Sequence, residues 1–359
     1  MTSASLSFVE RSIASHPVLL KASGKAAAMF RHLSLKPYQP QRRGREFSAA
    51  PVSESIHAVR SSIYRERGSG VMPTIVVGGF VPDATEVVEF QRPLLREFGS
   101  IYYINYPRNG FSETLFFAQL ADLVEDINLR GERPVLLGIS FGAGLIARFI
   151  RNSSAAIVSG IRGVAMVSPV LCTEDLVRPA GERSGGVRML ESNLRRILSA
   201  RSSDSADIER QIERARRCFS GLFGIGAENR QLGGRHLAIK NKIMNTIEKT
   251  PFLGGYERVL ALQSFALTGD ECLFSGPALV LLAETEENLL VPTSPTLALC
   301  RDSNRFLGLL PKGKCSRVSS GNAADPVAHA SLIFHHEQYN SHLASWYSRL
   351  LGPKMFAAI

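Results

Sequence analysis

Residues 135–147 read VLLGISFGAGLIA and carry the most informative pattern in the chain. A short apolar run ends at a Gly-x-Ser-x-Gly motif, and a stretch with helical character follows directly. The five-residue motif alone is weak evidence, but a strand-turn-helix setting is the context that a nucleophile elbow requires. The sequence therefore predicts that Ser140 lies on a tight turn and projects its hydroxyl above the edge of a sheet.

Two glycines explain how such a turn can form. The serine must adopt a strained backbone conformation, and a side chain at either flanking position would strike the neighbouring strand or helix. Gly138 and Gly142 leave this space free. The backbone amide of Phe141, at the start of the helix, then points toward negative charge that develops on a substrate oxygen.

Outward from this motif, short apolar runs alternate with helical stretches. Runs of four to seven residues that are apolar on both faces are typical of parallel strands covered by helices on either side. The alternation predicts an α/β fold with a mostly parallel central sheet flanked by helices. The five runs are residues 74–77, 101–104, 135–139, 163–167 and 278–283.

Two helices are expected to cover this sheet. Ser112 can cap a helix whose apolar residues follow the i, i+3, i+4, i+7 spacing, and Gly131 ends it. The segment from Ala84 to Phe98 is expected to play the same part between the first two runs.

The pattern divides the chain into three parts. Residues 1–50 hold eight Lys or Arg and two acidic residues, which indicates a basic N-terminal extension. Residues 51–171 and 276–359 are expected to form the α/β core. In residues 172–275 the alternation stops and helical, charge-rich sequence takes over, so this part is predicted to be an inserted helical cap or lid.

Composition excludes several classes of protein. With 359 residues and 45% apolar content the chain buries a core, and no apolar run approaches the length of a membrane span. The five cysteines lack metal-ligand spacing, and no phosphate-cradling loop is present, so neither metal nor cofactor is expected. Most of the +10 charge surplus lies in the Ser- and Ala-rich extension, which argues against nucleic-acid binding. Without a secretory signal, a cytoplasmic location is the default, and the sequence indicates no particular oligomeric state.

From about residue 70 to 350 the sequence resembles the α/β-hydrolase superfamily, and in particular its capped serine hydrolases. Residues 74–80, TIVVGGF, look like the family's oxyanion strand and turn, although Gly78 replaces the frequent histidine. The resemblance implies that the Phe80 amide is the second oxyanion donor. Residues 104–112, INYPRNGFS, look like the strand-four loop, with Asn105 in place of the frequent aspartate.

The same resemblance implies a triad acid after strand seven, within residues 278–292, ALVLLAETEENLLVP. Counting forward from the end of the apolar run selects Glu286. Counting back from the closing proline selects Asn288, which cannot carry the charge that stabilises an imidazolium. Glu286 is therefore expected to be the acid, with Glu287 in reserve. Glu174 and Asp175 are further alternatives, because some relatives take the acid from the preceding strand.

Residues 327–334, VAHASLIF, resemble the loop that carries the family's histidine into the terminal helix, so His329 is the implied general base. The order Ser140, Glu286, His329 is the order of nucleophile, acid and base on this fold. It implies a hydrolase that cleaves a carboxylic ester or thioester of a small-molecule acyl substrate. An acyltransferase that uses the same triad, or a binding protein that has kept only the fold, is the alternative.

The insertion, which the family places between strands six and seven, would supply the apolar walls of the pocket. The same residues could instead form the core of the cap itself. The candidates are Leu190, Leu194, Ile197, Phe219, Leu222, Phe223 and Phe252.

Overall fold

The computed structural model describes residues 34–49, 56–179, 188–199, 205–228, 233–263 and 271–352. Most of the predicted extension, residues 1–33 and 50, therefore lies outside the described residues.

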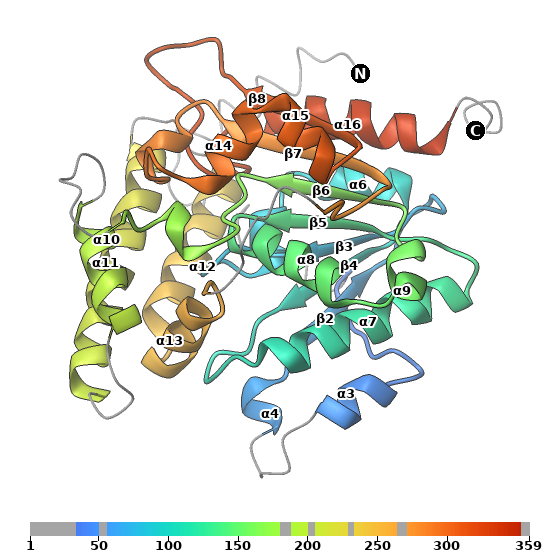
Figure 1. The fold of residues 1–359 in the computed structure, drawn as a ribbon, viewed down its shortest axis with the longest axis horizontal. Helices are drawn as coiled ribbons and strands as arrows, with labels where there is room; N and C mark the ends of the chain where they lie inside the picture. The colour runs from blue at the N-terminus through green and yellow to red at the C-terminus, as the bar shows by residue number, and fades with distance from the viewer. Residues whose placement is uncertain are drawn as a thin grey trace.

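A single eight-stranded sheet forms the centre of the molecule, in the order β1-β2-β4-β3-β5-β6-β7-β8 (Figure 1). The six strands from β3 to β8 run parallel to one another. At one edge, β2 pairs antiparallel with both of its neighbours, β1 and β4. The five predicted apolar runs are confirmed as β3 to β7. The strands are β1 (Lys36–Pro37), β2 (Ser62–Glu66), β3 (Thr74–Val77), β4 (Ile101–Asn105), β5 (Val135–Ile139), β6 (Gly163–Val167), β7 (Pro277–Ala283) and β8 (Lys312–Val318).

Sequence reasoning missed three strands, and all of them lie toward the edges of the sheet. β2 reads SIYRE and β8 reads KGKCSRV, so polar side chains interrupt the apolar pattern. A strand near an edge is covered less completely than an inner strand, and it therefore needs no continuous apolar run.

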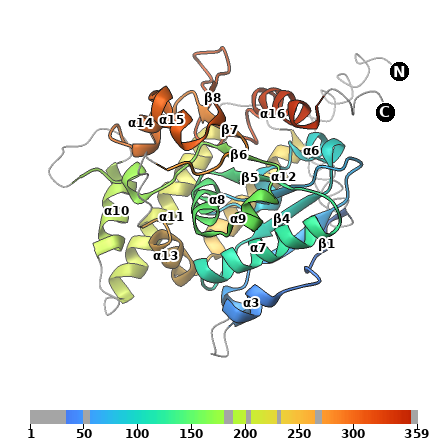
Figure 2. The same cartoon turned by 45° about the vertical axis from the view of Figure 1, so that its right-hand side comes forward.

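Helices cover both faces of the sheet (Figures 1 and 2). One face packs against α5 (Ala84–Val87), α6 (Arg92–Phe98) and α16 (His336–Leu351), and the other against α7 (Glu113–Leu129), α8 (Phe141–Asn152) and α9 (Ala155–Ser159). Each apolar side chain buried in these layers stabilises the fold by about 1.5–3 kcal/mol relative to exposure. Burial on both faces explains why the inner strands are apolar throughout.

The prediction of one continuous helix from Ala84 to Phe98 is wrong. The structure ends α5 at Val87 and starts α6 at Arg92. Pro93 occupies the first turn of α6, where its missing N–H costs nothing, whereas inside one long helix its ring would clash with the carbonyl of Glu89.

The helix expected after Ser112 is confirmed as α7. The Ser112 side chain accepts a hydrogen bond from the Leu115 amide at 3.3 Å, which satisfies one free donor of the first turn. Gly131 follows the helix with a φ of 79°, a conformation that favours glycine.

Helices fill the chain between β6 and β7, and they lie together at one end of the sheet (Figures 1 and 2). α10 packs against α11 and α13, and α12 contacts α5 of the core. That these helices act as a cap over a substrate stays a prediction. They are η1 (Thr173–Asp175), α10 (Arg188–Ser199), α11 (Ser205–Glu228), α12 (Gly234–Lys249) and α13 (Phe252–Leu260).

Three short helical elements follow β7 before the last strand. They are η2 (Glu286–Asn288), α14 (Pro295–Arg301) and α15 (Ser303–Leu309), and β8 follows α15 directly. η2 starts three residues after β7 ends, so it lies at the carboxyl edge of the sheet.

The described end of the predicted extension packs against the core. β1 pairs with β2, α3 (Gly44–Ala49) lies on α7, and α4 (Ile56–Val59) leads into β2. Arg45 pairs with Asp122 of α7 at 2.9 Å, and the buried Glu46 pairs with Arg60. None of the described helices combines the length and the apolar composition that a membrane span requires.

Candidate functional site

Ser140 forms the turn between β5 and α8. Its φ of 52° and ψ of −115° place it in a strained region for a residue with a side chain. Three backbone hydrogen bonds hold the turn. The Ser140 amide donates to the Val167 carbonyl at 2.9 Å, and the amides of Ala143 and Val170 donate to the Ser140 carbonyl at 3.0 and 3.2 Å. The strand-turn-helix arrangement matches the one predicted from residues 135–147.

The flanking glycines have no room for a side chain. A Cβ on Gly142 would lie 2.4 Å from the carbonyl oxygens of Val77 and Gly78, and a Cβ on Gly138 would lie 2.7 Å from the Cα of Ala143. Since these neighbours are backbone atoms, they cannot move aside cheaply. The turn therefore requires glycine on both sides, for the steric reason that the sequence indicated.

Three side chains predicted from distant parts of the sequence meet at the carboxyl edge of the sheet. The Nε2 atom of His329 lies 2.9 Å from the Oγ atom of Ser140, and its Nδ1 atom lies 2.5 Å from the Oε2 atom of Glu286. Ser140 and His329 are half-buried, whereas Glu286 is fully buried. The geometry joins hydroxyl, imidazole and carboxylate in a chain of hydrogen bonds, and their catalytic roles stay a prediction.

Glu286 is buried and yet keeps its charge. Burial raises the pKa of its carboxyl, but the charge of His329 and hydrogen bonds from His329, the Ala283 amide and Ser168 outweigh it, so the pKa lies below its usual range. The bond from the Ala283 amide to Oε1 measures 2.7 Å. A carboxylate held in this way can orient the imidazole and stabilise its protonated form.

Asp175 is engaged elsewhere. Its carboxylate accepts hydrogen bonds from the amides of Leu171 and Cys172 at 2.8 and 3.2 Å. It also accepts bonds from the Ser294 hydroxyl at 2.5 Å and from the amide and hydroxyl of Thr296 at 3.0 and 2.7 Å. These bonds tie η1 to the start of α14, which is a structural task.

The other two reserve carboxylates face solvent. Glu287 forms ion pairs with Arg301 at 3.0 Å and Arg317 at 2.9 Å, and the hydrogen bond from Arg317 is the main cause that lowers the pKa of Glu287 to about 2. Glu174 is exposed and accepts a bond from the Thr173 hydroxyl. Of the four candidates, Glu286 is the one that contacts His329.

The predicted oxyanion residues lie on the other side of Ser140. Phe80 follows β3, Phe141 opens α8, and their ring centroids are 5.4 Å apart in an edge-to-face arrangement. A Cβ on Gly79 would lie 3.9 Å from the Cβ of Ser140, so the loop after β3 passes directly beside the serine. The role of the two backbone amides as oxyanion donors stays a prediction.

Sequence reasoning missed Ser168, which connects the acid to the histidine loop. Ser168 is fully buried after β6 with a φ of 46°, and its hydroxyl accepts a hydrogen bond from the Ala330 amide at 2.9 Å. The same hydroxyl donates to Glu286 and helps lower the pKa of its carboxyl. Its position directly after an apolar strand neighbouring that of Ser140 was a signal that could have located it, because adjacent parallel strands end at the same edge.

The apolar candidates in the insertion whose side chains are described divide into two groups. Leu190, Leu194 and Ile197 are buried in the packing of the insertion helices. The Phe223 ring lies 5.6 Å from that of Phe334, which is on the loop that carries His329. The side chains of Phe219, Leu222 and Phe252 lie outside the described residues.

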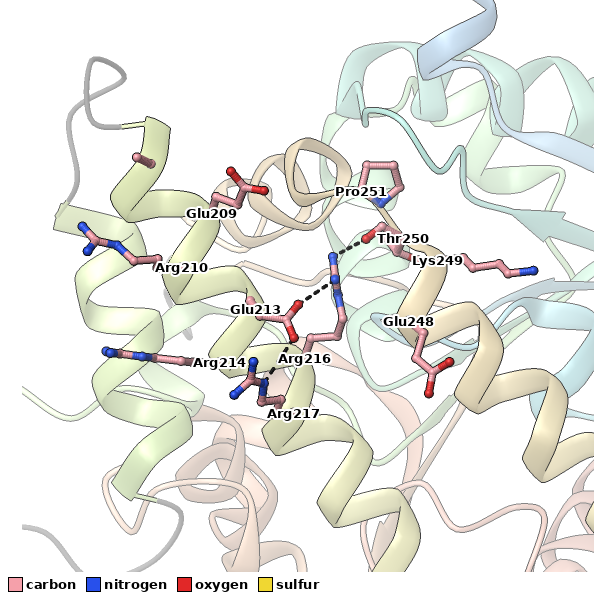
Figure 3. Close-up of a pocket in the computed structure, with 11 residues that line it drawn as sticks. Glu209, Arg210, Glu213, Arg214, Arg216, Arg217, Glu248, Lys249, Thr250 and Pro251 are labelled. Atoms are coloured by element: carbon pink, nitrogen blue, oxygen red, sulfur yellow. Dashed lines mark hydrogen bonds and ion pairs between the residues drawn. The ribbon is translucent and has the colours of Figure 1, made fainter.

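A pocket of about 640 Å³ between α11 and the junction of α12 with α13 is polar (Figure 3). Arg216 projects into it, donates to the Thr250 carbonyl and pairs with Glu213 at 2.7 Å. Five basic and three acidic side chains line this pocket, so it does not provide apolar walls for an acyl chain. Among the described residues, no group of three or more His, Cys, Asp or Glu side chains is arranged to hold a metal ion.

Neither a protein-family model nor a curated protein matches this sequence. Solved structures do match. An esterase from Exiguobacterium antarcticum superposes with a TM-score of 0.55 at 13% identity, over 80% of this chain and 96% of that one. MenH from S. aureus superposes with a TM-score of 0.55 at 11% identity, over 81% of this chain and 99% of that one. A bromoperoxidase from Bacillus anthracis superposes with a TM-score of 0.54 at 16% identity, over 80% of this chain and 96% of that one. Together with the strand order and the turn at Ser140, these matches show that the chain has the α/β-hydrolase fold.

Proposed function

We propose that the protein is a serine hydrolase that cleaves a carboxylic ester or thioester through an acyl-enzyme on Ser140. The observation that carries this proposal is the hydrogen-bonded chain from Ser140 through His329 to the buried Glu286. The structural likeness to an esterase is in keeping with it.

In the first half of the reaction, the Oγ atom of Ser140 attacks the acyl carbon while its proton passes to Nε2 of His329. Glu286 stabilises the imidazolium through Nδ1. The carbonyl oxygen becomes an oxyanion, for which the amides of Phe80 and Phe141 are the proposed donors. The tetrahedral intermediate then expels an alcohol or thiol, which takes the proton from His329, and leaves the acyl group on Ser140.

In the second half, water takes the place of the leaving group. His329 removes a proton from the water as it attacks the acyl carbon, and then returns this proton to Ser140 when the acid product leaves. An acyltransferase would follow the same steps with an alcohol, amine or thiol in place of water. Added acceptors distinguish the two, because only a transferase converts them to acyl products faster than it hydrolyses the ester.

A fluorophosphonate probe tests whether Ser140 is an activated nucleophile. We expect covalent labelling of the wild-type protein, no labelling of Ser140→Ala, and unchanged labelling of the control Ser159→Ala, whose serine is exposed on α9. p-Nitrophenyl esters and acyl thioesters of graded chain length then measure turnover. A wild-type protein that folds, is not labelled and cleaves none of these compounds would contradict the proposal and favour a binding role.

A further inference from the structure

Helix α13 of the insertion forms hydrogen bonds to the two loops that follow β3 and β4. The Arg258 guanidinium donates from Nη1 to the Phe80 carbonyl at 2.8 Å and from Nη2 to the Pro107 carbonyl at 2.6 Å. The neighbouring Glu257 carboxylate accepts a hydrogen bond from the Phe111 amide. One short helix therefore holds both the loop after β3 and the loop after β4.

Arg258 is buried to an unusual degree for a charged side chain. Only 1% of the residue is exposed, and its guanidinium carbon lies 5.1 Å from the ring centroid of Tyr106. Burial lowers the pKa of Arg258 to about 10, so the group still carries its charge at neutral pH. A buried guanidinium is costly unless its donors are satisfied. Both Nη atoms of Arg258 donate to carbonyls and the group lies over an aromatic ring, whereas its Nε atom has no hydrogen-bond partner among the described residues.

The partners of Arg258 and Tyr106 flank one particular peptide unit. The Tyr106 hydroxyl donates to the Gly78 carbonyl at 2.8 Å, and Arg258 holds the Phe80 carbonyl. Between these two carbonyls lies the peptide that joins Gly79 to Phe80 and carries the Phe80 N–H. Two successive glycines leave this backbone free to rotate, so the flanking carbonyls must be held if the N–H is to keep one direction.

We infer that Arg258 is a positioning residue for the oxyanion site: from the insertion, and together with Tyr106, it fixes the orientation of the Phe80 amide. This inference rests on the proposed hydrolase function. It adds that the insertion contributes to catalysis by holding the backbone of the core, beyond any contact with the substrate. An amide that is already oriented needs no rearrangement when charge develops, and this is the source of oxyanion stabilisation.

The experiment compares Arg258→Met and Arg258→Lys with the control Arg216→Met. Arg216 is an arginine of the same insertion that also donates to a carbonyl, but its partners Thr250 and Glu213 both belong to the insertion and not to the loops beside Ser140. For each protein we would measure kcat and KM on the best p-nitrophenyl ester, the affinity for an aliphatic trifluoromethyl ketone, and the melting temperature. The ketone forms a tetrahedral adduct with serine whose oxygen mimics the oxyanion.

We expect Arg258→Met to lower kcat by about 10²- to 10³-fold, the loss that follows removal of one oxyanion donor. KM should change by less than about threefold, and affinity for the ketone should fall in parallel with kcat. The kcat and ketone affinity of Arg258→Lys should lie between those of wild type and Arg258→Met, since a compact ammonium does not reproduce the fixed, planar set of donors with which the guanidinium bridges two carbonyls. Arg216→Met should keep the wild-type values.

A purely structural role would lower the melting temperature and leave kcat and ketone affinity of the folded protein unchanged, and that result would overturn the inference. If Arg258→Met does not fold, Tyr106→Phe decides, because it removes only the hydroxyl at the Gly78 carbonyl. It should lower kcat and ketone affinity by about tenfold, in line with one hydrogen bond, and unchanged values would again overturn the inference. Wild-type labelling by the fluorophosphonate separates the two proposals: labelled wild type with unaffected variants refutes only the role of Arg258, whereas unlabelled wild type refutes both.

Discussion

The two sides of Ser140 are supported in different ways. On one side, His329, Glu286 and Ser168 come from loops that follow β8, β7 and β6, and the insertion packs on the histidine loop through apolar side chains such as Phe223 against Phe334. On the other side, the loop after β3 is held by Arg258, which belongs to the insertion. On the acid-base side the insertion thus contributes apolar packing, whereas on the oxyanion side it contributes hydrogen bonds from a buried arginine.

This difference indicates how the protein would respond to change. Substitution of His329 or Glu286 should remove proton transfer and leave the fold intact. Substitutions on the oxyanion side should act by degrees, because they loosen a backbone that still carries its amides. Four predictions test this contrast, in order of decreasing effect.

His329→Gln removes the proposed general base and should have the largest effect. We expect kcat to fall by about 10⁵- to 10⁶-fold, as when a triad histidine is lost. The melting temperature should stay within a few degrees of wild type. Ester turnover and thermal unfolding measure the two quantities. As control, His342→Gln on α16 should keep full activity, and an active His329→Gln would contradict the assignment.

Glu286→Gln and Glu287→Gln form a matched pair of neighbouring residues. The first should lower kcat by about 10⁴-fold, since an amide cannot stabilise the imidazolium. The second should change kcat by less than twofold, because Glu287 pairs with surface arginines. Equal losses in the two variants, or a greater loss for Glu287→Gln, would show that the triad is assembled differently in solution.

Asp83, beside the oxyanion loop, should make stability depend on pH. Burial, and then the charge of Glu86, raise the pKa of Asp83 from 3.8 to about 6 against the attraction of Arg108. The folded chain therefore holds this proton more tightly than the unfolded chain. Its stabilising effect is complete below about pH 4 and is lost as the pH rises through about 6.

Asp83→Asn removes this titration. The free energy of unfolding of wild type relative to Asp83→Asn should fall by about 3 kcal/mol between pH 3.5 and 7.5, which is the shift converted at 1.36 kcal/mol per pKa unit. Denaturant unfolding at a series of pH values measures the difference. A constant difference over this range would mean that folding leaves the pKa of Asp83 unchanged.

Ser168→Ala should have the smallest effect. It removes one hydrogen bond to the Glu286 carboxylate and one acceptor for the Ala330 amide. We expect a loss of about tenfold in kcat, because a bond to a charged group contributes about 1.5 kcal/mol or more. Ser345→Ala, an exposed serine on α16, is the control. Wild-type turnover by Ser168→Ala would mean that the other partners of Glu286 suffice to hold it.

Much of the fold was readable from local patterns. Inner strands buried on both faces must be apolar throughout, so residues 74–77 and 135–139 could be recognised as strands from the sequence. The turn at Ser140 could be recognised in the same way from its flanking glycines. Strands nearer the edge, such as β2 and β8, carry polar residues and left no such pattern. The break between α5 and α6 was also readable in principle from Pro93, but the apolar spacing on both sides of it favoured one helix.

By itself, the sequence determined the parallel sheet, the glycine-flanked turn of Ser140 and the short set of side chains that were able to join it, because these depend on the spacing of neighbouring residues. Only the tertiary structure decided which carboxylate meets His329, and it alone brought Ser168 and Arg258 to the site. Such choices depend on where strand ends and an inserted helix meet in space. Residues 258 and 80 are far apart along the chain, and no local pattern records that their atoms lie within a hydrogen bond of one another.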